Sequence, residues 1–509
     1  MKQIIVLLVL AITLTFSSCT KLDERFRSEL EQNNSGTITP DQLLTSAYNS
    51  ISQPFQGNGN LWASQQISSD EAIAPTRGPD WDDNGAWRAL SSHTWNSNQD
   101  QVRGAFNELL GAQFAASNVL QFNPSPQQAA EARFLRALSM YWVLDGYDQV
   151  PYREDLTNYK ILPKTLIGLE AVDFIVGELN AIMGDLPDAG AAYLANKNGA
   201  RALLMKIYLN KGVYANRAAP AFDAADMNQV ITLADQITAS GKYSLNNIFY
   251  DNFAPDNHVK STENIYTFEN SPAANRGGNV RGFAFMVSHY NMNPGGWNGF
   301  STLSDFYDKF EAADQRKGAY YVYPGSLPNP GKRINVGFLI GQQYNLTTDA
   351  PLKDRKGAPL AFTRGVKLRE TGDDLEITGI RPMKYPFDYA TPGDQKNNDF
   401  AVFRYADVLL MKAEALLRTS SAAAALPIVN SIRAKRGATA LATVDLTSLL
   451  DERGRELYWE GFRRQDQIRF GTYLLAYQEK PASDPKTLLF PIPGDQLAVN
   501  PNLTQNPGY

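Results

Sequence analysis

The side chains best suited to binding a ligand lie in one short segment of the chain. Three of the seven tryptophans fall within residues 81–95, and planar polar side chains lie among and just before them. Aromatic rings stack on the C–H faces of sugars, and Arg, Asp and Asn side chains offer paired hydrogen bonds to sugar hydroxyl groups. The segment therefore predicts a sugar-binding loop. Its expected contact residues are Trp81, Asp82, Asn84, Trp87 and Arg77.

A second segment presents a single tryptophan on irregular backbone. Trp297 lies within residues 290–300, where four Gly and Pro residues disfavour a regular helix or strand. We predict that Trp297, Asn298 and Tyr290 also contact a ligand. For each tryptophan of the two segments, the alternative is a packing role that anchors its loop to the hydrophobic core.

Two other chemistries fit the first segment less well. Residues 80–85 match the first half of a calcium-binding loop, but its twelfth position is Ser91, where a bidentate Glu is needed. Glycoside hydrolysis needs two carboxyl groups on opposite sides of the bond, ~5.5 or ~6.5–9.5 Å apart, whereas the carboxylates of residues 80–83 share one turn. The sequence has no serine-hydrolase, nucleotide-loop or zinc-protease motif. We predict a binding protein without a metal or a cofactor, and not an enzyme.

A dense run of charged residues near the carboxy terminus has a structural interpretation. Opposite charges alternate there at helical spacing, which is typical of ion pairs that hold a helix and its following turn. The segment 451–470 is therefore interpreted as an ion-pair network and not as an acid–base site. Its members are Glu452, Arg453, Arg455, Glu456, Glu460, Arg463, Arg464 and Asp466.

Composition excludes several other classes of protein. With 43% hydrophobic and 11% aromatic residues, the 509-residue chain has enough apolar material for a large core and is not disordered. There are 48 Lys and Arg against 53 Asp and Glu, a net charge of −5 without a long basic run, so nucleic-acid binding is not expected. Three histidines and one cysteine do not suffice for a disulfide framework or a zinc ribbon.

The amino terminus has the pattern of a lipoprotein signal. A lysine at position 2 precedes an apolar run over residues 4–16, which is shorter than the roughly 20 residues of a membrane-spanning helix. Small residues then lead to Cys19, as in the cleavage box of bacterial lipoproteins. We predict a signal peptide over residues 1–18, lipidation of Cys19 and a polar tether over residues 19–38; ordinary secretory cleavage is the alternative.

The elements that must position the two tryptophan segments are mainly helices. Apolar residues at helical spacing begin near Asp41, an expected N-cap. Consecutive helices of similar length, rich in Ala and Tyr, resemble tetratricopeptide hairpins. The expected helices cover residues 101–122, 129–147, 199–211, 405–418 and 422–435, and a further helix includes residues 230–237 and ends at Gly241.

The part of the chain between these helical blocks has a different character. Residues 250–400 are rich in Asn, Gly and Pro, with short strand-like pieces such as residues 265–268 and 334–338. Long loops in a protein with a substantial core usually carry function. We therefore expect a helical frame that carries a large face built from loops.

Several motifs resemble the SusD/RagB family. Residues 399–415, DFAVFRYADVLLMKAEA, are similar to the most characteristic helix of that family, and residues 430–437, NSIRAKRG, follow it. The closing pattern at residues 500–509, NPNLTQNPGY, also resembles the family almost residue for residue. Residues 131–137 and the hairpin at 199–245 fit as well, so the resemblance spans essentially the whole mature chain.

The resemblance implies a fold and a domain plan. The expected fold is mainly α-helical: tetratricopeptide-like hairpins form a superhelical frame, packed with a loop-rich region that contains a few short strands. A single domain is expected over residues 39–509. Its helical frame would cover about 39–250 and 400–480, and its loop-rich ligand face about 55–100 and 250–400.

The resemblance also implies a function. The chain is expected to be a lipoprotein of the outer membrane of Bacteroidetes, anchored only by its lipid and facing the cell exterior. It would capture oligosaccharides and deliver them to a TonB-dependent SusC-like transporter. The alternative is a tetratricopeptide-like interaction scaffold, or a binder of peptides or other nutrients, that pairs with such a transporter without affinity for glycans.

Overall fold

The structure is a computed structural model that describes residues 38–153, 156–158, 160–271, 281–391 and 396–509. The expected signal peptide, Cys19 and the tether up to residue 37 lie outside the described residues. From Pro40 onward the chain forms one unit with its own core.

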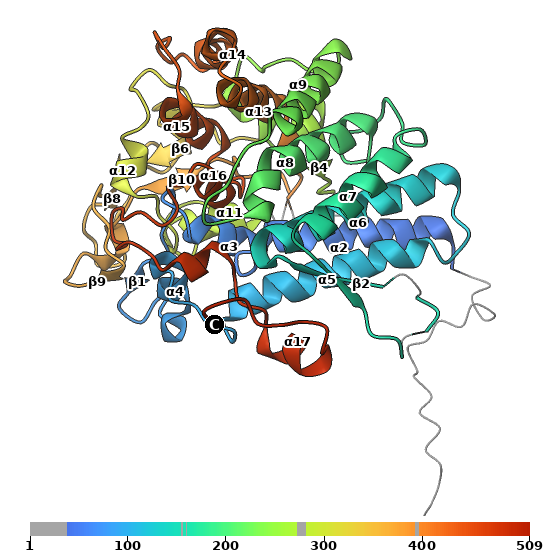
Figure 1. Cartoon of the computed structure of the whole chain (residues 1–509). Coiled ribbons are helices and arrows are strands. Elements are labelled where there is room, and N and C mark those ends of the chain that lie inside the picture. The colour runs from blue at the N-terminus through green and yellow to red at the C-terminus, as the bar shows by residue number, and fades with distance from the viewer. Residues whose placement is uncertain (1–37, 154–155, 159, 272–280, 392–395) are drawn as a thin grey trace, which may run out of the picture. The chain divides into compact units, whose positions relative to one another are not determined.

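Helices make up most of the regular structure (Figure 1). The helices of the first half are α2 (Pro40–Gln56), α3 (Leu61–Ile67), α4 (Ala86–Ser92), α5 (Asp100–Val119), α6 (Pro126–Tyr147), α7 (Leu169–Ile182), α8 (Lys197–Ala215) and α9 (Ala224–Ala239). Those of the second half are α10 (Asn257–Lys260), α11 (Arg281–Val287), α12 (Ser304–Tyr307), α13 (Tyr405–Arg418), α14 (Ala422–Lys435), α15 (Leu446–Leu457), α16 (Arg463–Arg469) and α17 (Gly494–Val499).

Strands and 3-10 turns are short and fill the connections. The strands are β1 (Thr76–Arg77), β2 (Gln149–Tyr152), β3 (Lys164–Ile167), β4 (Asn264–Phe268), β5 (Gly318–Ala319), β6 (Val336–Leu339), β7 (Gly341–Gln342), β8 (Ala361–Phe362), β9 (Arg369–Glu370), β10 (Arg381–Met383) and β11 (Phe400–Arg404). The 3-10 turns cover Asp83–Gly85, Phe249–Asn252, Leu375–Ile377 and Pro485–Leu488.

The long helices pack as successive pairs. Helices α2, α5 and α6 lie side by side, α7 and α8 follow, and α9 packs against both α8 and α13 (Figure 1). The start of α6 is determined locally, since Ser125 is the N-cap, forms a capping box with Gln128 and is followed by Pro126 at the first helical position. The expected mainly helical fold is confirmed, and α13 and α14 have the expected bounds.

Two local expectations need correction. Asp41 is not an N-cap, because α2 already includes Pro40, which has no N–H to leave unpaired in a first helical turn. The strand expected at residues 334–338 begins two residues later, at Val336, where it pairs with Ala319.

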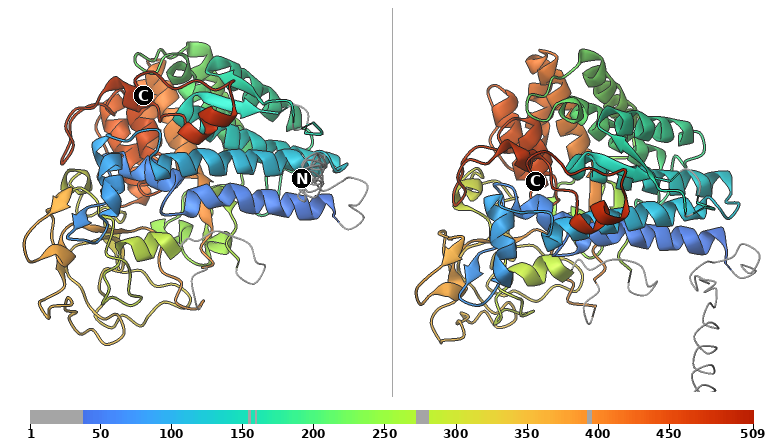
Figure 2. Two further views of the ribbon diagram at one scale, coloured as in Figure 1. Left: turned by 90° about the horizontal axis from the view of Figure 1, so that it is seen from below. Right: turned by 60° about the horizontal axis from the view of Figure 1, so that its bottom comes forward.

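The loop-rich part is tied to the helices by small sheets. Strand β4 pairs antiparallel with β11, which leads directly into α13. Strands β10, β6 and β5 form a three-stranded sheet, and β1, near the first tryptophan segment, pairs in parallel with β9. Figure 2 shows residues 288–391, in yellow to orange, gathered on one side of the blue and cyan helices.

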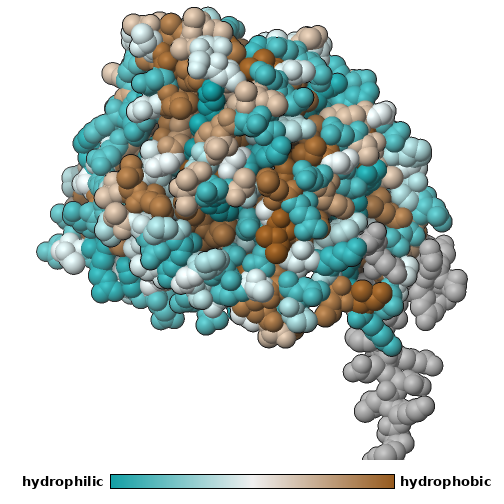
Figure 3. Space-filling view, in the orientation of Figure 1, coloured by the Kyte–Doolittle hydropathy of each residue, from teal (hydrophilic) through white to brown (hydrophobic). Residues whose placement is uncertain are grey.

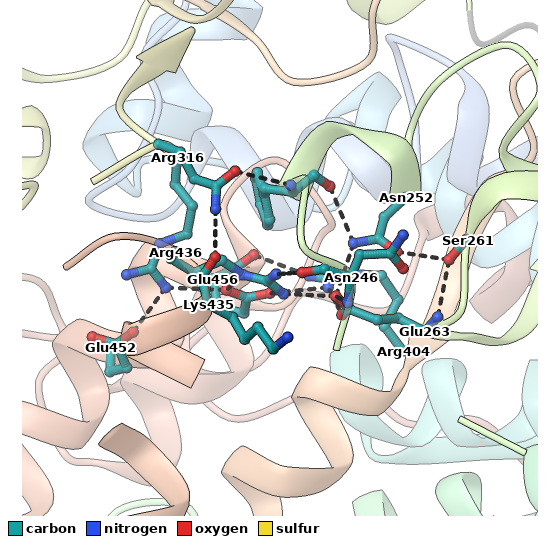
Figure 4. A network of polar contacts seen from close by, with 12 residues as sticks. Asn246, Asn252, Ser261, Glu263, Arg316, Arg404, Lys435, Arg436, Glu452 and Glu456 are labelled. Carbon is teal, nitrogen blue, oxygen red and sulfur yellow. Dashed lines mark hydrogen bonds and ion pairs between the residues drawn. The ribbon is translucent and has the colours of Figure 1, made fainter. Parts of the chain in front are cut away.

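The charged run at residues 451–470 forms ion pairs, as expected, but they are buried. Glu456 accepts hydrogen bonds from Arg316, Arg404 and Arg436 at 2.8–3.1 Å, and every one of these side chains is 0% exposed. Glu263 joins Arg404 to Arg436 (Figure 4). The network therefore includes residues far outside the charged run.

The molecular surface combines hydrophobic and hydrophilic side chains. On the face in Figure 3, hydrophobic side chains occur in separate groups among hydrophilic ones. Among the residues that the structure describes, no helix combines the length and the apolar composition needed to cross a membrane.

Substitution of Glu456 tests the importance of this network. Glu456→Gln keeps the shape of the side chain but removes a negative charge that three buried arginines share, so we expect the free energy of unfolding to fall by about 3–5 kcal/mol. The control is Asp100→Asn, which removes an exposed i,i+3 pair with Arg103 and should cost about 0–1 kcal/mol. Urea unfolding measures both, and equal losses would contradict a dominant role for the network.

Candidate functional site

The two tryptophan segments meet in the structure. The indole Nε1 of Trp81 donates a hydrogen bond to the carbonyl oxygen of Trp297 at 2.9 Å. Nearby, the backbone of Ile73 bridges to Ser301. Loops more than 200 positions apart in the sequence thus form one surface. Helix α12 follows the second loop in the sequence, and Thr302, just ahead of α12, bridges to Ile380, which precedes β10.

Trp81 is half-buried in this surface and fixes its geometry. Its backbone is left-handed, with φ of 60°, and its ring centroid lies 5.0 Å from that of Phe300 and 5.4 Å from that of Trp87. A Cβ added to Gly299 would lie 2.3 Å from Trp81 Cζ2. Only glycine at position 299 therefore lets the indole ring approach the second loop this closely.

Arg77 is a clamp between the two loops. It is 3% exposed, and its guanidinium donates to the carbonyl oxygens of Asn298, Gly299 and Thr378 and to the hydroxyl group of Ser301. Burial lowers the pKa of this guanidinium to about 10, so it stays charged at neutral pH. Because these hydrogen bonds occupy its donor groups, the structure favours a packing role for Arg77 over the expected contact with a ligand.

Trp87 and Asn298 are also buried. Trp87 is 5% exposed and donates to Asp83 Oδ2 at 2.5 Å, while Asn298 is 2% exposed and accepts from Arg381 at 2.8 Å. For Trp87 the structure agrees with the packing alternative raised from the sequence, whereas the burial of Asn298 was not anticipated. Trp87 and Asn298 are buried beneath the surface formed by the two tryptophan loops.

The remaining expected contact residues reach solvent. Trp297 and Tyr290 are half-buried, Asp82 is partly exposed and Asn84 is exposed. Asp82 pairs with Arg88 at 2.5 Å, which fixes its carboxylate. Their role as ligand contacts stays a prediction.

Tyr290 is held by groups that the sequence did not single out. Its hydroxyl donates to Asp80 Oδ2 at 2.8 Å, and the guanidinium of Arg355 lies 4.0 Å from its ring centroid. Burial and the neighbouring Asp80 carboxylate raise the pKa of Tyr290 to about 12, so the hydroxyl keeps its proton. Arg355 comes from a turn-rich stretch without hydrophobic period, which offers no signal of this contact.

The titratable groups near the surface are engaged in structural hydrogen bonds. His289 Nδ1 accepts from the backbone N–H of Asn291, which leaves Nε2 to donate to Glu376 at 2.9 Å. His93 is a core residue, and burial lowers its pKa to about 3. Among the described residues, no three His, Cys, Asp or Glu side chains are placed to hold a metal ion. The arrangement is suited to stacking and hydrogen bonding.

Comparison with known proteins relates the chain to one family. Residues 235–483 match the family model described as the SusD family. The starch-binding protein SusD of Bacteroides thetaiotaomicron is 25% identical over 75% of this chain and 73% of its own length. A SusD-like protein, P2, of Formosa agariphila is 22% identical over 95% of this chain and 96% of its own.

Solved structures share the fold over nearly the whole chain. Surface glycan-binding protein A of Bacteroides thetaiotaomicron, solved in complex with laminarihexaose, has a TM-score of 0.68 at 16% identity and covers 92% of this chain and 98% of its own. Its counterpart from Bacteroides uniformis has a TM-score of 0.70 at 18% identity, with the same coverage. Residues 235–483 thus match the SusD family, and the fold over nearly the whole chain is that of the SusD-like solved structures.

The close approach of Gly299 to Trp81 gives a direct test of the surface. Gly299→Ala should push the indole ring away, lower the free energy of unfolding by about 1–3 kcal/mol and change the tryptophan fluorescence. Gly365→Ala is the matched control, because nothing lies within 4 Å of its added Cβ, and should stay within about 0.5 kcal/mol of the parent chain. Identical spectra and stabilities for both variants would refute the contact.

Glu71, which lies ahead of the first tryptophan segment, makes stability depend on pH. It is 2% exposed, and burial raises its pKa to about 8, while one carboxylate oxygen accepts from the backbone N–H of Trp459. Between about pH 4.5 and 8 the unfolded chain has lost this proton and the folded chain keeps it, so stability falls as pH rises.

Glu71→Gln removes the titrating group and with it this part of the pH dependence of stability. From pH 6 to pH 8 the parent chain should lose about 1–2 kcal/mol more unfolding free energy than the variant. Chemical unfolding at both pH values measures the difference. Parallel losses would show that Glu71 is already ionised in the folded protein.

Proposed function

We propose that this chain is a cell-surface glycan-binding lipoprotein that captures oligosaccharides and delivers them to a TonB-dependent SusC-like transporter. The observation that carries the proposal is the hydrogen bond from Trp81 to Trp297, which joins two loops into one aromatic and polar surface. Half-buried rings with hydrogen-bonding side chains beside them suit the alternating C–H and hydroxyl faces of sugars.

The named relatives support the same function. One is called a starch-binding protein, one was solved with laminarihexaose, and another is described as a laminarin-binding SusD-like protein. These are names of binding proteins and not of enzymes. In this chain, Asp80 and Asp82 are held by Tyr290 and Arg88, as expected of carboxylates that position a surface.

The geometry indicates how capture works. Trp297 and Tyr290 would offer ring faces, and Asp82 and Asn84 would accept or donate hydrogen bonds at the exposed end of the first loop. Because Arg77 holds the loop backbones in place, little conformational entropy is lost when a sugar binds. Lipidation of Cys19 would keep this surface at the outer membrane, on the exterior side.

Substitution of Trp297 tests glycan capture. Calorimetric titration of residues 20–509, which contain the whole unit beginning at Pro40, against a panel of neutral and acidic oligosaccharides should give saturable binding to at least one. Trp297→Ala should weaken that binding at least about tenfold, or roughly 1.4 kcal/mol, at an unchanged melting temperature. Trp297 is preferred to Trp81, whose loss would also disturb the packing around Phe300.

The control for this experiment is Tyr320→Ala. Tyr320 is an exposed aromatic residue, at 39%, on the segment that follows β5, and it is not among the expected contact residues. Its substitution should leave the affinity unchanged. Binding that survives Trp297→Ala would reject the site, and flat titrations across the panel would favour the interaction scaffold or a peptide ligand instead.

A further inference from the structure

A cavity of about 350 Å³ lies beside the second tryptophan loop. It is lined from three segments, residues 288–294, 323–346 and 383–389, and none of its lining residues is among the expected contact residues. Its volume is at the lower end of the ~300–1,000 Å³ found for ligand pockets. A site of this size suits one or two sugar rings and not a long chain.

The cavity has an apolar floor and a polar rim. Phe338, Leu339 and Met383 of strands β6 and β10 are buried and form the floor. Asn293 and Lys332 are exposed and mark the rim. Such a lining can seat a sugar ring by contact with its C–H face and leave its polar substituents at the opening.

Aromatic rings connect this cavity to the tryptophan surface. The ring centroid of Phe285 lies 6.0 Å from that of Trp297 and 5.5 Å from that of Phe387, which lines the cavity. Tyr389, another lining residue, donates a hydrogen bond to the carbonyl oxygen of Asn293 at 3.2 Å. The loop that presents Trp297 is thus also the wall of the cavity.

The charges of the lining have one sign. Lys332 and Arg333 line the cavity, and no Asp or Glu does. Arg333 is balanced, because its Nε donates to Asp349 at 2.7 Å and its guanidinium lies 3.6 Å from the ring centroid of Tyr344. The ammonium group of Lys332 has no ion-pair partner among the described residues, so one positive charge at the rim remains uncompensated.

We propose that this cavity binds one anionic sugar residue of the captured glycan, with its acidic group against Lys332 and its ring in the cavity. A positive charge without a counter-charge, at the rim of a cavity without carboxylates, attracts a uronate or a sulfate ester and gives a neutral sugar no comparable gain. The proposal deepens the proposed function and rests on it, because it names the class of glycan that the same face would select.

The test compares oligosaccharides that differ only in charge. Residues 20–509 are titrated with tetragalacturonate and its methyl ester, and with a sulfated carrageenan tetrasaccharide and its desulfated form. We expect one of the two acidic probes to bind at least about fivefold more tightly than its neutral counterpart, and the preference to shrink as salt is raised. Which acidic probe binds distinguishes a carboxylate from a sulfate ligand.

Lys332→Gln should remove that preference while the affinity for neutral probes stays unchanged. Lys242→Gln is the matched control, since it removes the same charge from an exposed lysine that does not line the cavity. Equal binding of acidic and neutral probes, or a preference that survives Lys332→Gln, would overturn the proposal while leaving Trp297-dependent glycan capture intact. Absence of binding to every probe and to the neutral panel would overturn both.

Discussion

The structure depends on a buried network of charges that joins its helical and loop-rich parts. Arg316 lies just ahead of β5, Arg404 is the last residue of β11, and Arg436 directly follows α14. All three converge on Glu456 of α15. Charges removed from water are stable only when every partner is present. These four segments are therefore held in one arrangement, which fixes the ends of the loops between them.

Buried cations also hold the segments nearer the surface that we propose for ligand binding. Lys384, just after β10, is buried and donates to Glu460, which connects the floor of the cavity to the network. Arg77 and Arg381 are buried as well, and both hold Ser301. Loops rich in glycine and proline keep a defined geometry here because cations fix their backbone, so the binding surface is preorganised although it contains little regular structure.

Hydrophobic periodicity was sufficient to predict the frame but not the details of the site. The bounds of α13 and α14 follow from apolar spacing, because α14 buries one face and most of α13 is buried. Arg77 and Asn298 have side chains equally suited to a ligand or to a buried backbone carbonyl, and burial, which decides between the two, depends on distant segments. The cavity combines residues 288–294, 323–346 and 383–389, and no local pattern indicates that these segments meet.

The proposed function requires that a glycan binds to the surface that joins the two tryptophan loops. A crystal structure of residues 20–509 with the oligosaccharide of highest affinity tests it most directly. We expect a sugar ring on the face of Trp297 or Tyr290, with the rest of the oligosaccharide extending toward the cavity rim at Lys332. A glycan located on the helical frame, with both tryptophan loops unoccupied, would contradict it.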